Sequence, residues 1–323
     1  MVGDFSYRFD TCVLFATMFV VCSAPWPCAA GTPPDLDTIL ARCEQSLLRD
    51  QTFSAHYDLW QRQDRPWVKG KEQISWRYAS IDFFQELGGR FAAHEKKWID
   101  LPSQDAPLDP KACQVQTRVW LPAEGRFYSC VTLLEPSDDP KFRLEPGRIT
   151  ITTRTAKQAD DWRHFDLDKL FHAQIGQDAP VPTFLRTVQC VLGRQLEPVN
   201  GFKCYVIHSV NKCGTFSVWI DPEHGYNIAK CEDRQDGHDL MGGQPLPRPG
   251  VTGGGAIIGG SSVYEVVRFE NVADRWLPTE IRSSGETRWQ GGTVGKTSSI
   301  AKCSRFTFTP DLDKEKAFEL DFP

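Results

Sequence analysis

The first half of the chain changes from a helical to an extended pattern of apolar residues. Between Asp35 and Arg49 the apolar residues recur every three or four positions, which predicts one amphipathic helix. Asp35 or Asp37 can cap its first turn, and Arg49 stands at its end. From Phe53 onward apolar and polar residues alternate, which is typical of strands with one buried face. The alternation predicts strands at 53–60, 71–79, 81–87, 90–99, 115–121, 125–134 and 148–155.

The middle of the chain returns to helical spacing before the extended pattern resumes. Residues 159–173 and 180–193 are expected to form two helices, the second beginning near Pro182 and ending at Gly193. Further strands are expected at 263–269, 276–282, 286–290 and 298–309.

A three-strand meander is predicted between Gly201 and Arg234. The runs 205–207, 216–220 and 226–229 are rich in β-branched and aromatic residues, and turn residues separate them. In the second turn Pro222 presets φ, the Asp221 side chain can bond the backbone two residues on, and Gly225 can take a positive φ.

These residues carry a resemblance to a known family. The run from Phe216 to Pro222, with Gly225 and Tyr226, resembles the strand–turn–strand of the periplasmic lipoprotein carriers LolA and LolB, and so does 276–281. The resemblance implies a strongly curved antiparallel sheet, a half barrel, that wraps over helices and holds acyl chains in its concave face. Similar turns also occur in sandwiches and propeller blades. The positions that match the motif are fold-determining ones: Trp219, Asp221, Pro222, Gly225, Tyr226, Trp276 and Pro278.

The expected fold class is mainly antiparallel β with helices (α+β). We expect a curved half-barrel sheet wrapped over an N-terminal helix and an inserted helical pair. After a linker at 31–34, residues 35–323 form a single domain in this interpretation. Stretches rich in proline or glycine predict insertions near 101–112, 134–147 and 236–260, the last of them a mobile loop or a lid over one rim of the sheet.

Residues 1–30 have the pattern of a secretory signal peptide. An apolar run of ten residues, 12–21, follows Arg8, and small residues and helix breakers precede a cleavage site expected after Ala30. An uncleaved anchor is the alternative, because Asp4 and Asp10 are unusual in such a leader. The prediction is therefore a periplasmic or secreted protein.

Charge and cysteine content limit the possible partners and bonds. The formal net charge is −5 and no basic cluster is present, which argues against nucleic acid. Eight cysteines follow the leader, an even number that is compatible with disulfides or with buried free thiols. Cys113 and Cys130, which flank a short predicted hairpin, are the expected pair if disulfides form.

Motifs for cofactors and catalysis are not found in the sequence. Residues 291–297 look like a phosphate-binding loop, but the spacing is one residue short and a strand-like segment follows, so a hairpin turn is expected. The histidines and cysteines lack metal-ligand spacing, and no G-x-S-x-G occurs, so neither a cofactor nor a metal is predicted.

The favoured function is an exported, non-catalytic protein that binds an acyl chain, a lipid or a lipoprotein in a concave sheet. Burial of each methylene stabilises such a complex by about 0.8 kcal/mol. Large side chains in predicted strands are the candidate ligand contacts: Trp60, Trp76, Phe84 and Trp219. The alternative is a periplasmic sensor that binds an envelope protein partner, similar to the RseB-type regulators, and a third class is a secreted hydrolase. The family's strand arginine, which handles the lipoprotein, has no counterpart that the sequence identifies.

Overall fold

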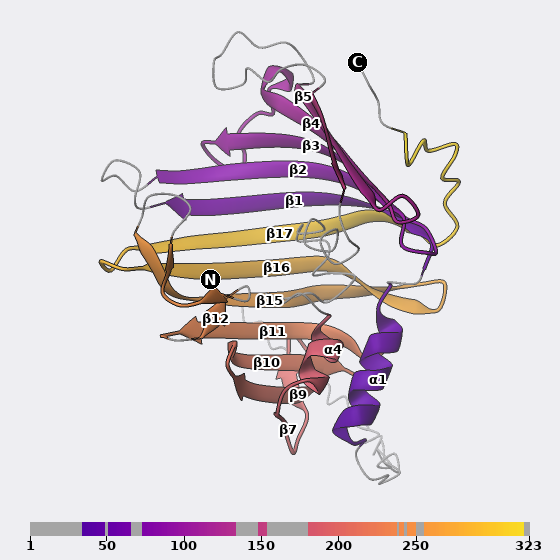
Figure 1. Cartoon of the computed structure of the whole chain (residues 1–323). Coiled ribbons are helices and arrows are strands. Elements are labelled where there is room, and N and C mark those ends of the chain that lie inside the picture. Colours follow the sequence, from indigo (N-terminus) through magenta and orange to yellow (C-terminus); the bar gives the residue numbers. More distant parts are fainter. Residues whose placement is uncertain are drawn as a thin grey trace, which may run out of the picture. The chain divides into compact units, whose positions relative to one another are not determined.

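One antiparallel sheet dominates the computed structural model (Figure 1). The structure describes residues 34–48, 51–65, 73–133, 148–153, 180–237, 239–241, 244–249 and 255–319. Residues Asp35–Pro323 form one compact unit. The expected leader, the insertion at 134–147 and the helix at 159–173 lie outside the described residues.

The sheet is open and curved. Its strands follow the order β6-β5-β4-β3-β2-β1-β17-β16-β15-β11-β10-β9-β7, and β14 and β8 pair with β15 and β9. Paired strands are antiparallel. The main strands are β1 (Phe53–Arg65), β2 (Gln73–Gln85), β3 (Phe91–Leu101), β4 (Cys113–Leu121), β5 (Arg126–Leu133), β6 (Arg148–Thr153), β9 (Phe202–Asn211), β10 (Gly214–Asp221), β11 (Asn227–Asp236), β15 (Ala256–Val272), β16 (Arg275–Trp289) and β17 (Val294–Thr307). The shorter strands are β7 (Cys190–Leu192), β8 (Glu197–Val199), β12 (Leu240–Met241), β13 (Gln244–Pro245) and β14 (Arg248–Pro249).

Helix α1 (Leu36–Ser46) lies within the first segment expected to be helical. Asp35 caps it, since the Thr38 N–H donates to Asp35 Oδ1 at 2.8 Å. Its buried face carries Ile39, Leu40 and Cys43. Of the helices in the described ranges, none is both long and apolar enough to cross a membrane.

Helix α4 (Val181–Arg186) is much shorter than the expected helix at 180–193. Val191 and Leu192 instead belong to β7, where they pair with His208 and Ile207 of β9. The backbone hydrogen bonds that residues 190–192 form with the edge of the sheet stabilise a strand more than the helical spacing of apolar residues stabilises a helix. Arg186 of α4 forms an ion pair with Glu44 of α1.

Several strands are longer than alternation predicted. Strand β2 runs through Ser80, and β16 runs through the serines and the glycine at 283–285, because pairing with neighbours continues across these residues. The expected loop at 236–260 contains the short strands β12, β13 and β14. The segment at 291–297 begins as the turn between β16 and β17, with Gly291 and Gly292 at positive φ.

The turn between β10 and β11 is built as its residue types predict. Asp221 is fully buried, and its Oδ1 accepts the Glu223 N–H at 2.9 Å while Oδ2 lies 2.5 Å from His224 Nδ1. Gly225 has φ +73° and Tyr226 has φ +62°. The His224 ring packs on Trp276 at 4.5 Å between centroids. The meander β9–β10–β11 is therefore tied to β16 at this turn.

The eight cysteines that follow the expected leader are free thiols. The pairing expected between Cys113 and Cys130 is not formed, because the β4–β5 register places Cys130 opposite Thr117. Four positions therefore separate the two thiols along the strand direction, too far for a disulfide.

Candidate ligand-binding face of the sheet

The two faces of the sheet differ in what covers them. Phe53, Ala55, Tyr57 and Leu59 of β1 share one core cluster with α1. We name their side of the sheet the inner face, and the side of the alternate residues the outer face. Neighbouring residues on each face follow from the strand register.

A strip of large rings crosses one end of the inner face. Ring centroids are 5.6 Å apart between Phe53 and Phe83, 6.2 Å between Phe83 and Phe91, and 6.5 Å between Phe91 and Phe127. Phe306 of β17 extends the row, at 5.1 Å from Phe53. The register of β4 adds Trp120 opposite Phe91 and Phe127. We call these residues the aromatic strip: Phe53, Phe83, Phe91, Trp120, Phe127 and Phe306.

Smaller aliphatic residues continue the inner face along the strands. Ala79 and Ile81 of β2 pair with Leu59 and Tyr57 of β1 and are buried in the same core. Along β2 the inner-face residues from 77 to 83 span six positions, or roughly 20 Å at about 3.3 Å per residue. This length exceeds the roughly 15 Å of hydrocarbon in one leaflet of a bilayer, half of the about 30 Å core.

Basic side chains lie on the same face. Arg77 of β2 and Lys97 of β3 lie beyond or beside the aliphatic residues, whereas Arg118 of β4 stands opposite Ala93, two residues from Trp120 of the aromatic strip. We call these three residues the basic cluster. Glu95 is the one carboxylate on the inner face of these three strands, and its Oε2 lies 3.3 Å from Arg118 Nη2. Among the described residues, Glu95 therefore pairs with Arg118 and also lies near Lys97.

The environments of Lys97 and Arg77 can be given for the described residues. Burial lowers the pKa of Lys97 most; Glu95 opposes this, and Arg77 and Arg118 lower it further. Arg77 Nη1 donates to Gln61 Oε1 at 3.3 Å, but its buried Nε has no hydrogen-bond partner among the described residues. A bound anion would supply an acceptor and a negative charge.

The four aromatic residues predicted to contact ligand do not share this face. Trp60 and Trp76 lie together on the outer face, where Trp60 packs on Tyr78 at 4.6 Å, and the segment 101–112 covers them. Both residues have even numbers on strands whose inner-face residues have odd numbers, so their side chains point to the outer face. This segment includes the short 3-10 helix η1 (Pro110–Ala112).

Phe84 lies in a separate cluster, whereas Trp219 is buried in the main core cluster that also holds the inner-face residues of β1. Phe84 packs with Ala92, Val119 and Ala317 of the C-terminal segment. Trp219 donates from Nε1 to Glu197 Oε2 at 3.2 Å, and Lys230 Nζ lies 4.8 Å from its ring centroid. A common groove lined by the four expected residues is therefore not formed. A ligand contact at any one of them stays a prediction.

Sequence inspection missed the aromatic strip and the basic cluster. The alternation of apolar and polar residues predicts that Phe53 and Phe83 are each buried. It does not show that the two side chains lie on the same face of the sheet. The register between β1 and β2 supplies that link, with Ala55 opposite Phe83.

Comparisons with known proteins give a general likeness of fold. No family model matches the chain, and no curated protein matches it either. Among solved structures, a DUF1329 family protein from Desulfovibrio piger is 12% identical, with a TM-score of 0.40, over 88% of this chain and 98% of that chain. A LolA superfamily protein from Nitrosomonas europaea is also 12% identical, with a TM-score of 0.37, over 89% of this chain and 99% of that chain. Both likenesses are low in identity and in TM-score.

Proposed function

We propose that this protein is an exported carrier that binds an amphipathic ligand, with an acyl chain and an anionic head group, on the inner face of its sheet. The observation that supports the proposal is that the aromatic strip and the basic cluster lie on one face, with Ala79 and Ile81 between Phe83 of the strip and Arg77 of the cluster. A fatty acid, a lipid or the acylated end of a lipoprotein has this division of polarity.

Two energy terms favour such a ligand. Each methylene that leaves water contributes about 0.8 kcal/mol. A carboxylate or phosphate that accepts from a guanidinium forms a charge-assisted hydrogen bond, which contributes about 1.5–3 kcal/mol. The strip is buried, so we expect the acyl chain to enter through local opening of the inner face.

Titration with a fluorescent fatty acid and with its uncharged methyl ester tests this proposal. We expect one saturable site, and Arg77→Gln should weaken binding of the acid by about tenfold, or about 1.4 kcal/mol. The ester should bind the variant and the parent protein equally. Arg282→Gln, on the outer face and 59% exposed, is the matched control and should change neither affinity. Non-saturable binding, or equal loss of acid and ester, would contradict the proposal.

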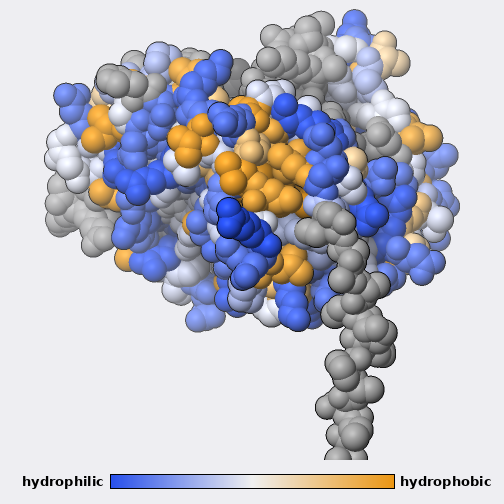
Figure 2. All heavy atoms as spheres, turned by 90° about the horizontal axis from the view of Figure 1, so that it is seen from below, coloured by the Kyte–Doolittle hydropathy of each residue, from blue (hydrophilic) through white to orange (hydrophobic). Residues whose placement is uncertain are grey.

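A second candidate function is contact with an envelope protein at the β7 edge of the sheet. Val191 of β7 and Val210 of β9 are 63% and 76% exposed. Figure 2, seen from the side on which β7 and β9 lie in Figure 1, shows hydrophobic side chains gathered near the centre and hydrophilic ones around them. Exposed apolar side chains beside an open strand edge are typical of a binding surface.

Crosslinking in envelope extracts tests the second candidate. A discrete crosslinked species should disappear when Val191 and Val210 are both replaced by lysine. Leu87→Lys, at a turn residue that is 68% exposed, is the control and should leave the species unchanged. A species retained in both variants would exclude this edge as the contact.

A further inference from the structure

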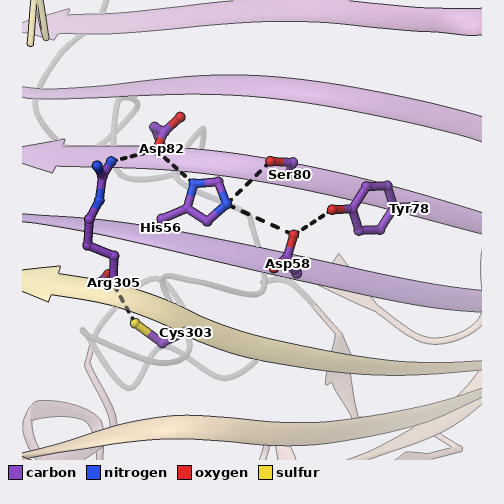
Figure 3. Close-up of polar contacts among 7 residues, drawn as sticks. All are labelled: His56, Asp58, Tyr78, Ser80, Asp82, Cys303 and Arg305. Atoms are coloured by element: carbon purple, nitrogen blue, oxygen red, sulfur yellow. Dashed lines mark hydrogen bonds and ion pairs between the residues drawn. The ribbon is translucent and has the colours of Figure 1, made fainter. Parts of the chain in front are cut away.

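A chain of polar contacts crosses the outer face around His56 (Figure 3). His56 Nδ1 lies 2.8 Å from Asp82 Oδ1, and His56 Nε2 lies 3.5 Å from Ser80 Oγ. The register explains the arrangement, because His56 stands opposite Asp82 and the next outer-face residue of β1 stands opposite Ser80. A carboxylate, an imidazole and a hydroxyl are therefore aligned in that order.

The contacts favour one tautomer of His56. When Nδ1–H donates to Asp82, Nε2 has a free lone pair that can accept the Ser80 hydroxyl proton. Arg305 Nη2 holds the same Asp82 oxygen at 3.1 Å. Asp58 Oδ1 is 4.0 Å from His56 Nε2, beyond hydrogen-bond distance, and accepts the Tyr78 hydroxyl at 2.5 Å instead. Asp82 is thus the carboxylate that orients the imidazole.

A cavity of about 440 Å³ opens beside the hydroxyl. Ser80, His56, Lys96 and Thr117 line its floor, and Glu315 and Lys316 of the C-terminal segment line its other side. The volume is within the range of about 300–1,000 Å³ that small-molecule sites have.

Two features of the cavity wall matter for chemistry. Lys96 stands directly opposite Ser80 in the β2–β3 register and lines the same cavity, on the strand that flanks β2 on the side away from His56. His94 Nε2 lies 2.8 Å from the Ala317 carbonyl oxygen, which holds the C-terminal segment over the sheet. The site therefore has a cation beside the hydroxyl and a covering segment.

We propose that this outer-face cavity hydrolyses small acyl esters, with Ser80 as the nucleophile, His56 as the general base and Asp82 as a positioning residue. Ser80 Oγ attacks the ester carbonyl carbon while its proton passes to His56 Nε2. The ester C–O bond then breaks, and the leaving alcohol takes the proton from His56. Water attacks the acyl-serine and gives a proton to His56. The bond between the acyl carbon and Ser80 Oγ then breaks, and His56 returns the proton to Ser80 Oγ, which releases the acid and free Ser80. The Lys96 ammonium stabilises the negative oxygen that forms in both steps.

The site around His56 contains groups that a surface ion pair does not need. An ion pair between His56 and Asp82 needs neither a hydroxyl on the second ring nitrogen nor an adjacent cavity. The site is also independent of the proposed ligand face, because Ser80 and Ala79 point to opposite sides of β2.

Labelling with a fluorophosphonate and hydrolysis of p-nitrophenyl acetate test this inference on the full chain. Peptide mass mapping should locate the label on Ser80. Ser80→Ala should abolish labelling and lower kcat/KM by at least about 100-fold, and His56→Gln should lower kcat/KM by a similar factor. Asp82→Asn should lower kcat while KM stays constant, because it acts through His56.

Ser298→Ala is the matched control, since Ser298 is an exposed serine on the outer face of β17, opposite Arg62. It should retain full labelling and turnover. Label on another residue, or ester turnover in the parent protein no faster than in buffer, would overturn the inference. Mapping of the label on the unmutated protein decides the matter even if a variant fails to fold. Fatty acid binding should be unchanged in Ser80→Ala, which separates this test from that of the inner face.

Discussion

Replacing Arg118 by methionine removes the cation that pairs with the buried carboxylate of Glu95. The Glu95 side chain is 4% exposed and that of Arg118 is 12% exposed, and the charged atoms are 3.3 Å apart. With an effective dielectric constant of about 20, the attraction is 332/(20 × 3.3), or about 5 kcal/mol, before desolvation is subtracted. Loss of one partner from a buried pair costs about 3–5 kcal/mol, because the other charge stays buried without compensation. We expect the free energy of unfolding of Arg118→Met to fall by that amount.

The double variant separates the ion pair from lost packing. Glu95→Gln with Arg118→Met removes both charges, so it should lose less stability than the two single variants together, by about 1.5–3 kcal/mol. Urea unfolding at pH 7, followed by tryptophan fluorescence, gives the four stabilities of the cycle. Arg126→Met is the matched control, since its pair with Glu124 is about half exposed and screened by solvent, and it should cost much less stability than Arg118→Met. A coupling energy below about 0.5 kcal/mol between Glu95 and Arg118 would refute the assignment of a buried pair.

Three further predictions concern stability. Asp221→Ala should lower the free energy of unfolding by about 2–4 kcal/mol, because two backbone N–H groups of its turn and His224 lose their acceptor. In urea unfolding, Asp221→Asn should lower it by about half as much. Burial raises the pKa of Cys43 and of Cys204 from 9.0 to about 12, so their stabilising contribution is fully present below pH 9 and is lost as the pH rises toward 12. Urea unfolding at pH 8 and pH 10.5 should show this loss, and it should be smaller in Cys43→Ala; an equal loss in the variant would speak against it. Phe83→Ala should cost about 3–5 kcal/mol in the same assay, because it leaves a cavity in the aromatic strip, and a cost below about 1 kcal/mol would mean that the ring is not packed as described.

Local chemistry explains the parts of the fold that could be predicted from the sequence. Alternation of Phe53, Ala55 and Tyr57 with polar residues depends on neighbours two positions apart, and it located β1 without a partner strand. The turn at Asp221 is likewise local, since a carboxylate can cap its own turn and Gly225 can take a positive φ in any context. Five of the seven residues that match the carrier motif therefore lie at or beside this one turn, and Trp276 and Pro278 lie on β16.

The ends of the strands and the length of the second helix were harder to predict, because they depend on hydrogen bonds with neighbouring strands. Ser80 interrupts an apolar pattern, but two neighbouring strands bond its backbone and β2 continues through it. Val191 fits a helix by spacing, yet β9 offers it an edge to pair with. At both positions, pairing with a strand distant in the sequence determined the secondary structure against the local pattern of residues.

The sequence by itself determined an antiparallel chain of strands, a capped first helix and a turn with its own hydrogen bonds. Only the tertiary structure decided which side of each strand faces the helices, and so it placed Trp60 on the outer face and assembled Arg77, Lys97 and Arg118 on the inner one. It also brought Ser80, His56 and Asp82 into line. The physical reason is that a shift of one residue in strand register moves every side chain to the other face, and register depends on hydrogen bonds between segments that are distant in the chain.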